Sequence, residues 1–438
     1  MLDSKKFFSK LEDVEQRLSE RGFILNREEI IKLKKEEKIL ETEINSLRIK
    51  RNLISKTIGI EKRISKNVNI LHIKAKKISE ELSCKALKLK TIKSKIREIF
   101  SEIPNLPEKH ILSSNRKKDD IEIKRWGKKR KFNFKIKNHI ELTKKNKNID
   151  FAIAAKISKS KFSVISGSLA RLYRALSQFM IDLHVDQHGY YEVLVPYIVN
   201  YQSLYHTGHL PKFMNDLFSI KLNKNLKENH EDYFLVPTGE VPMVNLVQDK
   251  IFSYESLPIK LISNTACFRL EAGSYGKKTR GLIRSHQFDK VELVQIVQPE
   301  KSRTALEELT SHAEKILELL KLPYRKLILH SENLGFSSSK TYDLEVWFPS
   351  QKKYIEISSC SNTTDFQSRR MNTKFKKGND RSKQLVHILN GSGLPIGRTM
   401  AAILENYQMC DGSIKIPEIL KRYMNELDQI SLDEPIRY

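Results

Sequence analysis

Cysteine is scarce in this sequence. The four cysteines lie far apart and form no Cys-x-x-Cys pair; they are Cys84, Cys267, Cys360 and Cys410. This spacing predicts neither a disulfide framework nor a zinc knuckle, and it favours a reducing compartment. The histidines show no ligand spacing either, so we expect no zinc site and ordinary packing or hydrogen-bonding roles for His206, His209 and His286.

Long apolar runs are also missing. The first residues, MLDSKKFFSKLEDVEQRL (1–18), lack the apolar segment of a signal peptide. No later stretch approaches the ~20 apolar residues that a membrane span needs. We therefore expect a cytoplasmic protein that does not enter a membrane.

Acidic residues are few relative to basic ones. The chain has 79 Lys and Arg against 53 Asp and Glu, and residues 51–150 alone have 29 basic against 11 acidic side chains. Such a concentration is typical of a protein that binds a polyanion. Part of the excess has another possible origin, because Lys, Ile and Asn are abundant throughout, as an A/T-rich genome would produce.

The N-terminal region shows a seven-residue apolar repeat. A first run, over residues 30–58, has Leu33, Leu40, Leu47 and Ile54 on one register and Ile30, Ile44 and Ile58 on the other, interrupted by Glu37 and Arg51. A second run, over residues 64–99, repeats the pattern with Lys85 as its polar interruption. We predict two long helices, a break around Gly59 and an antiparallel return, giving a hairpin roughly 50 Å long that ends at Pro104.

This pattern alone suits a dimerisation coiled coil or a spacer equally well. The charge favours another role, because residues 51–100 have 14 basic and 4 acidic side chains, whereas residues 1–50 have 12 and 11. The second helix should therefore present a basic face, which suits phosphate groups better than a second copy of itself.

A chain of 438 residues is long enough for two domains. The basic, turn-rich segment 115–139 is interpreted as a linker onto the edge of the second domain. From about residue 150 we expect a helix over 169–190, helices near 301–320 and 400–409, and β-rich runs over 190–199, 232–246, 259–270, 281–297, 339–348 and 352–361. Loops of varied length between such runs indicate an α+β fold, an antiparallel sheet with helices packed on it.

The stretch FRLEAGSYGKKTRGLIRSHQFDKVE (268–292) combines charge with glycine. If residues 268–271 form a strand, Arg269 and Glu271 point to the same face. A returning strand would bring Phe288 and Glu292 near that face, which suits a nucleotide: Arg for phosphate, Phe for stacking and Glu for an amine. Ordinary cross-strand ion pairs are the alternative.

The run LNGSGLPIGRTMAAILENYQ (389–408) places three glycines and Arg398 where an extended segment passes into a helix. The glycines permit close backbone approach, although they also fit simple turns. The run has neither a Walker-type Gly-Lys-Ser/Thr nor a Gly-x-Gly-x-x-Gly motif, so the usual phosphate loops are absent.

These two stretches resemble motifs 2 and 3 of class II aminoacyl-tRNA synthetases, and their details are similar to the seryl-tRNA synthetase family, bacterial type. YYEVLVPYIVN (190–200) resembles motif 1, TGHLPKF (207–213) and PTGEVP (237–242) the serine-site segments, and EISSCSNTTDFQSRR (356–370) the segment that binds ATP and metal. The resemblance covers the whole chain, with residues 1–110 as a tRNA-binding helical coiled-coil arm, 111–149 as a linker and 150–438 as the catalytic domain. It implies a serine–tRNA ligase that is a homodimer through the motif 1 region.

The resemblance also implies roles for individual residues. Arg269 should bind the α-phosphate and the serine carboxylate, Glu271 the adenine amine, Phe288 the adenine face and Arg398 the γ-phosphate, so Arg269 and Arg398 are the expected catalytic residues. The remaining ATP positions are Leu270, Glu356, Ile357, Ser358 and Ser359, with Glu356 and Ser359 around the Mg²⁺ that accompanies ATP. The serine positions are Thr238, Gly239, Glu240, Glu292 and Ser392, and the division of roles between the two carboxylates stays open.

Two residues depart from the family's usual pattern. Gly239 stands where a small residue with a Cβ is more common, and we expect it to loosen the strand that presents Thr238 and Glu240. Leu270 stands where a small polar residue is common, and its side chain should point away from the nucleotide.

The expected partners are L-serine, ATP, tRNA(Ser) and, where a cell contains it, tRNA(Sec). One alternative is a class II homologue that loads an amino acid onto a carrier protein, but such proteins lack the arm. Another is an RNA-binding paralogue without catalysis, which should have lost Arg269, Glu356 or Arg398.

Overall fold

The computed structural model describes residues 1–64, 67–109, 119–144, 148–221, 232–271, 281–378 and 382–432. The chain forms two compact units: residues 22–104, and residues 1–21 together with 105–438. We expected three parts, residues 1–110, 111–149 and 150–438. In the structure, residues 1–21 and 105–149 belong to the same compact unit as residues 150–438. Most of the basic loop at 273–281 lies outside the described residues.

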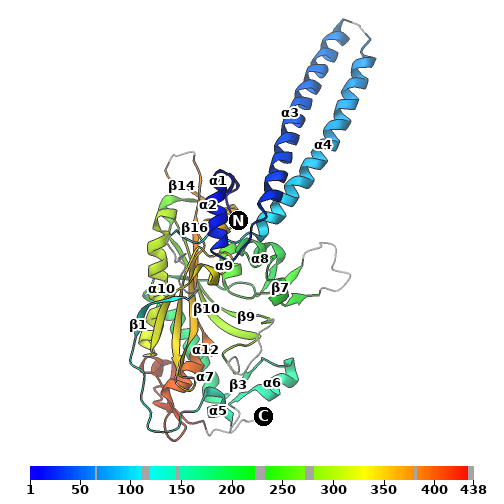
Figure 1. Cartoon of the computed structure of the whole chain (residues 1–438). Helices are drawn as coiled ribbons and strands as arrows, with labels where there is room; N and C mark the ends of the chain where they lie inside the picture. The colour runs from blue at the N-terminus through cyan, green and yellow to red at the C-terminus, as the bar shows by residue number, and fades with distance from the viewer. Residues whose placement is uncertain are drawn as a thin grey trace. The chain divides into compact units, whose positions relative to one another are not determined.

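The smaller unit is a helical hairpin made of α3 (Arg27–Arg63) and α4 (Asn69–Glu102), which run side by side in Figure 1. The break expected around Gly59 is wrong, because α3 continues for four residues beyond it. A glycine in a helix costs only about 1 kcal/mol relative to alanine, which a helix of 37 residues tolerates. The end is as expected, since α4 stops two residues before Pro104.

The two helices meet along a narrow apolar seam. Ile44 and Leu47 of α3 are buried with Leu82 of α4, and Ile78 and Leu89 pack against them. A hairpin needs only such a seam because its other faces remain in water.

Two of the polar residues that interrupt the heptads, Glu37 and Lys85, lie in ion pairs across the seam. Lys85 Nζ lies 2.8 Å from Glu43 Oε2. Lys93 Nζ lies 2.7 Å from Glu41 Oε1 and 4.0 Å from an oxygen of Glu37, which is a polar interruption on the facing helix. The interruptions therefore help to align the two helices instead of breaking them.

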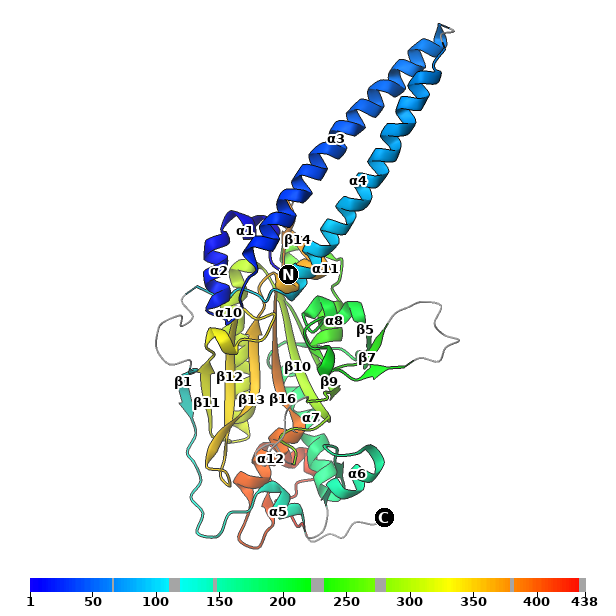
Figure 2. The ribbon, with the colours of Figure 1, turned by 45° about the vertical axis from the view of Figure 1, so that its right-hand side comes forward.

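The larger unit is built on an eight-stranded sheet in the order β1-β11-β12-β13-β16-β10-β9-β4, which Figure 2 shows face on from β1 to β9. The strands are β1 (Ile121–Trp126), β11 (Tyr324–Ile328), β12 (Lys340–Phe348), β13 (Lys353–Asn362), β16 (His387–Pro395), β10 (Gln287–Val297), β9 (Ile259–Phe268) and β4 (Tyr191–Glu192). All neighbouring strands are antiparallel except β4 and β9. The antiparallel sheet that the sequence predicts is confirmed, and the segment interpreted as a linker supplies its edge strand β1.

Three long helices pack against this sheet: α7 (Gly167–Asp186), α10 (Ser302–Leu319) and α12 (Ile396–Tyr407). Their apolar side chains form one core with Leu293 of β10 and Leu389 of β16. The contact with α10 is close, because a Cβ on Gly391 would collide with the side chain of Leu309. Since side chains alternate along a strand, Glu292 and Ser392, next to Leu293 and Gly391, face away from these helices.

Shorter elements complete the structure. The remaining helices are α1 (Ser4–Ser9), α2 (Leu11–Ser19), α5 (His139–Lys144), α6 (Phe151–Ser158), α8 (Tyr201–Thr207), α9 (Glu240–Asn245) and α11 (Phe366–Met371). The remaining strands are β2 (Ile149–Asp150), β3 (Val164–Ile165), β5 (Ile198–Asn200), β6 (Ser219–Ile220), β7 (Tyr233–Leu235), β8 (Ile251–Ser253), β14 (Lys374–Lys376), β15 (Gln384–Leu385), β17 (Ile414–Lys415) and β18 (Gln429–Ile430). None of the described helices is both long enough and apolar enough to span a bilayer.

The continuous strand expected over residues 190–199 is wrong. Only Tyr191–Glu192 and Ile198–Asn200 pair, in two different sheets, and Pro196 lies between them. Proline lacks the backbone donor that a ladder needs, so the chain leaves one sheet before it and joins another after it.

Candidate active site

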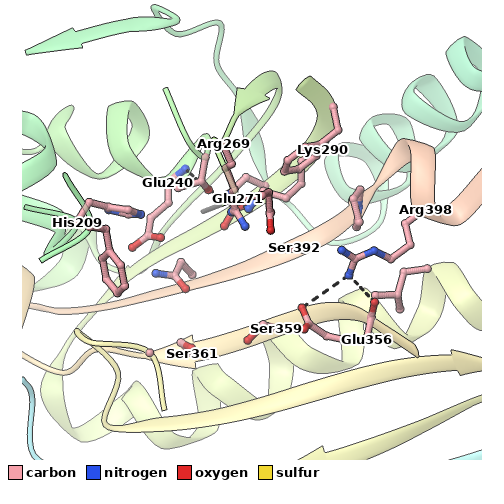
Figure 3. Close-up of a pocket in the computed structure, with 18 of the residues that line it drawn as sticks. His209, Glu240, Arg269, Glu271, Lys290, Glu356, Ser359, Ser361, Ser392 and Arg398 are labelled. Carbon is pink, nitrogen blue, oxygen red and sulfur yellow. Dashed lines mark hydrogen bonds and ion pairs between the residues drawn. The ribbon is translucent and has the colours of Figure 1, made fainter. Parts of the chain in front are cut away.

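A cavity of about 330 Å³ lies over the sheet face that the long helices leave free, and Figure 3 shows its labelled side chains converging. Arg269, Glu356 and Arg398 line this one cavity although they are far apart in the sequence. Its volume falls in the range of small-ligand pockets, and its walls are rich in charged groups. The convergence of these three residues is the arrangement that the sequence interpretation requires.

Strand β10 supplies three side chains to the cavity. Phe288, Lys290 and Glu292 alternate along it and all line the cavity. The residue between the last two, Val291, is in the apolar core instead. The returning strand predicted from the sequence is thus confirmed, with β10 antiparallel to β9.

Strand β13 brings Glu356 and Ser359 to the same cavity. Residues three apart on a regular strand point to opposite faces. Here the ladder with β12 shifts, since Ser358 is opposite Leu344 while Glu356 is opposite Glu345. The extra residue, Ile357, is a β-bulge, and it turns Glu356 onto the face that already carries Ser359.

Arg398 stands where β16 passes into α12 and reaches into the cavity opposite Glu356. Its Nε and Nη2 donate to the Ile283 carbonyl at 3.2 and 3.0 Å, and its Nη1 donates to the Glu356 carbonyl at 2.5 Å. Burial lowers the pKa of Arg398 from its ordinary value. Arg398 Nη1 also lies 3.9 Å from Glu356 Oε1, so three bonds to carbonyls and this ion pair hold the guanidinium at the cavity wall, where it can meet an anion.

The segment after β9 differs from the strand expected there. The strand ends at Phe268, and Glu271 has a left-handed backbone with φ of 49°. Arg269 and Glu271 therefore do not alternate along one strand, although both line the cavity. Arg269 donates to the Pro237 carbonyl at 3.0 Å with its guanidinium 5.4 Å from the centre of the Phe288 ring, and Glu271 Oε2 accepts from Arg284 Nη1 at 2.6 Å.

Glu240 lies at the other end of the cavity, beside His209 in Figure 3, and Thr238 also lines the cavity. The strand expected through them is wrong, because β7 ends at Leu235 and Glu240 is the first residue of α9. Gly239 is therefore at a helix start and cannot loosen a strand. A Cβ there would lie 2.9 Å from Thr265 Oγ1 and 3.3 Å from Glu292 Cβ, so glycine lets this turn pack directly on the cavity floor.

The two buried carboxylates of this end have different partners. Glu292 forms an ion pair with Lys290, whose Nζ also donates to Thr238 Oγ1 at 2.9 Å. Glu240 Oε1 accepts from the uncharged Gln367 Nε2 at 2.7 Å. Burial raises the pKa of Glu240 to about 7, and the negative charge of the neighbouring Glu292 contributes to this rise. Burial also raises the pKa of Glu292, although the positive charge of Lys290 acts in the opposite direction.

Lys290 and His209 also line the cavity, although the sequence interpretation assigned neither of them to the site. Lys290 alternates with Phe288 and Glu292, so the same strand argument could have found it. Only packing or hydrogen bonding was expected for His209. Its Nδ1 forms a hydrogen bond of 2.9 Å with Thr207 Oγ1, and this histidine also lines the cavity. Burial, with Arg269 and Lys290 nearby, lowers the pKa of His209 to about 3, so the ring is neutral at neutral pH.

Most of the predicted site residues meet in the cavity, and three do not line it. The lining residues are Thr238, Glu240, Arg269, Glu271, Phe288, Glu292, Glu356, Ile357, Ser359, Ser392 and Arg398. Gly239 packs against Thr265 and Glu292 below the cavity. The Leu270 residue is 36 % exposed to solvent. Ser358 is buried on the other face of the sheet, and its hydroxyl donates to the Ser392 carbonyl at 2.7 Å.

Oxygen ligands for a hard cation are present where Glu356 and Ser359 meet. The Glu356 side chain is 53 % exposed toward the cavity, and Ser359 is opposite Asp343 in the ladder. Burial and the Glu356 carboxylate raise the pKa of Asp343 to about 8. The Glu356 carboxylate and the Ser359 hydroxyl, which both line the cavity, are hard oxygen ligands of the kind that Mg²⁺ prefers.

Comparison with known families gives two matches along the chain. Residues 1–107 match the family described as Seryl-tRNA synthetase N-terminal domain. Residues 218–407 match the family described as tRNA synthetase class II core domain (G, H, P, S and T).

Solved structures agree over the full length. The seryl-tRNA synthetase from Pyrococcus horikoshii, complexed with ATP, is 31% identical with a TM-score of 0.89, and the match covers all of both chains. The cytoplasmic serine–tRNA ligase from Naegleria fowleri, in complex with AMP, is 25% identical with a TM-score of 0.84, covering 97% of this chain and 96% of that one. A prolyl-tRNA synthetase from Giardia lamblia, 14% identical with a TM-score of 0.54 over 64% of this chain and 54% of its own, shares the fold.

Proposed function

Because this chain belongs to the seryl-tRNA synthetase family and is a serine–tRNA ligase, we propose that the cavity described above is its active site. The observation that carries the proposal is the meeting of Arg269, Glu356 and Arg398 with two buried carboxylates in one cavity. Each group comes from a different segment, and each offers a charge or a hydrogen-bond acceptor for serine, for ATP or for the Mg²⁺ that accompanies ATP.

We place ATP along the Arg269–Arg398 side of the cavity. The Pyrococcus relative is complexed with ATP and the Naegleria relative with AMP. Arg398 takes the γ-phosphate, and Arg269 takes the α-phosphate together with the serine carboxylate. Phe288 stacks on the adenine and Glu271 accepts from its amine, while residues 270, 357 and 358 contribute backbone or support to the same walls.

Magnesium fits beside the phosphates. Glu356 and Ser359 would hold the ion, with the remaining ligands from phosphate oxygens and water. When bound, the ion supplies positive charge against the phosphate oxygens.

Serine fits between the two carboxylates. Among the residues that the structure describes, Glu240 forms no ion pair, so we assign it to the serine ammonium. Glu292 already pairs with Lys290 and takes the hydroxyl, together with Thr238 and Ser392. Alanine would leave these polar groups unpaired, which discriminates more strongly than excluding the extra methyl of threonine by size.

The first step is direct displacement at phosphorus. A serine carboxylate oxygen attacks the α-phosphorus of ATP, the bond to the bridging oxygen of pyrophosphate breaks, and seryl-adenylate forms. Arg269 holds the attacking carboxylate and the α-phosphate together, and Arg398 holds the leaving pyrophosphate. No side chain needs to form a bond to the substrate, which agrees with a cavity lined by cations and acceptors.

The second step transfers the seryl group to RNA. A hydroxyl of the terminal tRNA adenosine attacks the seryl carbonyl carbon, and AMP leaves. We assign capture of tRNA(Ser) to the hairpin of residues 22–104, whose α4 presents exposed lysines such as Lys74, Lys77 and Lys88. Where a cell contains tRNA(Sec), we extend the proposal to it, which depends on the bacterial type that the sequence suggests.

We also propose that the protein is a homodimer. Five large apolar side chains are exposed within residues 191–201: Tyr191, Leu194, Tyr197, Ile198 and Tyr201. Leu194 is 89 % exposed, and such a cluster on a folded surface favours burial against a second copy. The chain is assigned to the cytoplasm, as the Naegleria relative's description states for that protein.

The proposal is tested by ATP–pyrophosphate exchange with each of the twenty amino acids, with and without tRNA. We expect serine alone to support exchange without tRNA, and seryl-tRNA to form when tRNA(Ser) is added. Strong exchange with another amino acid would contradict the serine pocket. Transfer of serine to a carrier protein but not to tRNA would favour the carrier-loading alternative.

A further inference from the structure

The ring of His139 is a buried link between two elements of the candidate active site. His139 is the first residue of α5 and is 2 % exposed. Its Nδ1 lies 3.0 Å from Glu405 Oε1 of α12, and its Nε2 lies 3.3 Å from the backbone N of Leu282. The ring therefore joins the helix that carries Arg398 to the segment that leads into β10.

The two contacts fix the state of the ring. A backbone N–H can only donate, so Nε2 must accept from Leu282, and the ring proton must then be on Nδ1, which donates to Glu405. Glu405 is fully buried, and its oxygens accept from three further donors: the His139 N at 3.2 Å, the Ser350 N at 3.3 Å and the Ser350 Oγ at 2.6 Å. A buried carboxylate with four donors is a rigid anchor.

The residues next to Leu282 hold two proposed ATP ligands. The Ile283 carbonyl accepts both the Nε and the Nη2 of Arg398, and Arg284 Nη1 donates to Glu271 Oε2. The three consecutive residues 282–284 thus contact His139, Arg398 and Glu271 in turn, and all three line the cavity.

The contacts close a ring of interactions on α12. Arg398 and Glu405 are seven residues apart, which is about two helical turns and places them on the same side of the helix. Glu405 holds His139, His139 holds Leu282, and Ile283 holds Arg398. The fit against the ring is tight, because a Cβ on Gly281, whose φ is 71°, would collide with His139 Nε2.

We propose that His139 is a positioning residue for ATP, which keeps residues 281–284 against α12 and so aims Arg398 and Glu271 into the cavity. The inference rests on the proposed function, since it takes Arg398 and Glu271 as ligands of ATP. His139 is not among the described residues that line the cavity, and its ring partners Glu405 and Leu282 are not assigned to serine, so its effect falls on ATP.

Two substitutions separate positioning from stability. His139→Asn keeps a donor near the Nδ1 position for Glu405 but loses the acceptor for Leu282. His139→Gln can place its Oε1 near the Nε2 position and keep that acceptor, but it loses the donor to Glu405. We expect Asn to raise the KM for ATP in serine-dependent pyrophosphate exchange by about tenfold, as a group that orients a ligand typically does, with the KM for serine unchanged. Gln should come closer to the wild-type KM for ATP while melting at a lower temperature than Asn.

The decisive result is that the two variants rank in opposite order by the two measurements: Asn has the higher KM for ATP, whereas Gln has the lower melting temperature. If the KM for ATP follows melting temperature, with Gln worse than Asn, His139 acts only on stability and the inference is overturned. An unchanged KM for ATP in both variants overturns it as well. Arg398→Ala is measured in parallel. If Arg398→Ala loses exchange while His139→Asn keeps the KM for ATP of the wild-type enzyme, only this inference is overturned. If the wild-type enzyme itself shows no serine-dependent exchange, the proposed function is overturned.

Discussion

The cavity and the hairpin both use charged side chains, but in opposite ways. In the cavity, several charged groups are held in fixed positions by named partners, as Arg398 is by the Ile283 and Glu356 carbonyls and Glu292 is by Lys290. Along α4 the lysines are exposed, and only a few of them meet an acidic partner of α3. Fixed charge suits a reaction in which atoms must be held in line, whereas many mobile charges suit a large polyanion.

The strongest test of this difference is to remove one fixed charge from the cavity. We expect Arg269→Ala to reduce serine-dependent ATP–pyrophosphate exchange by about a thousandfold, because the α-phosphate loses the half-buried guanidinium that is assigned to it. Circular dichroism and thermal melting should show an intact fold. Arg125→Ala, which removes an exposed arginine on β1, is the matched control and should retain exchange. Near-normal exchange in Arg269→Ala would contradict its assigned role.

The exposed charges should behave differently when several are removed together. We expect the triple change of Lys74, Lys77 and Lys88 to Gln to weaken tRNA binding about tenfold and to flatten its log–log salt dependence by about 2, with exchange unaffected. The same change at Lys32, Lys35 and Lys38, which are exposed on α3, is the control. Equal effects from both sets would show that α4 has no special role.

Protonation tests the serine end of the cavity. With its pKa raised to about 7, Glu240 is mostly neutral at pH 6 and mostly charged at pH 8, and only the charged form attracts an ammonium group. The KM for serine in exchange should therefore be about tenfold higher at pH 6 than at pH 8. Glu240→Gln should have a raised KM with little dependence on pH in this range. A wild-type KM that is flat from pH 6 to pH 8 would contradict the assignment.

Sequence reasoning predicted the architecture well because periodicity reports burial directly. The heptads gave both helices of the hairpin, and the alternation of Phe288 and Glu292 placed both in the cavity. The error at Gly59 came from treating one glycine as a helix break, although a long helix with an apolar seam offsets that cost.

Local backbone geometry could not be predicted in the same way. The bulge at Ile357 and the left-handed residue at Glu271 are set by tertiary packing. The bulge brings together Glu356 and Ser359, which a regular strand would place on opposite faces, and the turn at Glu271 keeps this residue at the cavity although β9 has already ended. His139 was missed for another reason. It lies at the end of a basic, turn-rich segment interpreted as a linker, and its partners Leu282 and Glu405 are more than a hundred residues away.

The most direct test is to remove residues 30–100, replace them with a short Gly/Ser linker, and measure both half-reactions. Three apolar cores of the larger unit contain, among the described residues, none from the hairpin of residues 22–104, so this unit should fold without the hairpin. The account predicts that serine-dependent pyrophosphate exchange remains close to wild type while charging of tRNA(Ser) is abolished. Exchange lost from a folded protein, or charging that survives the deletion, would contradict it.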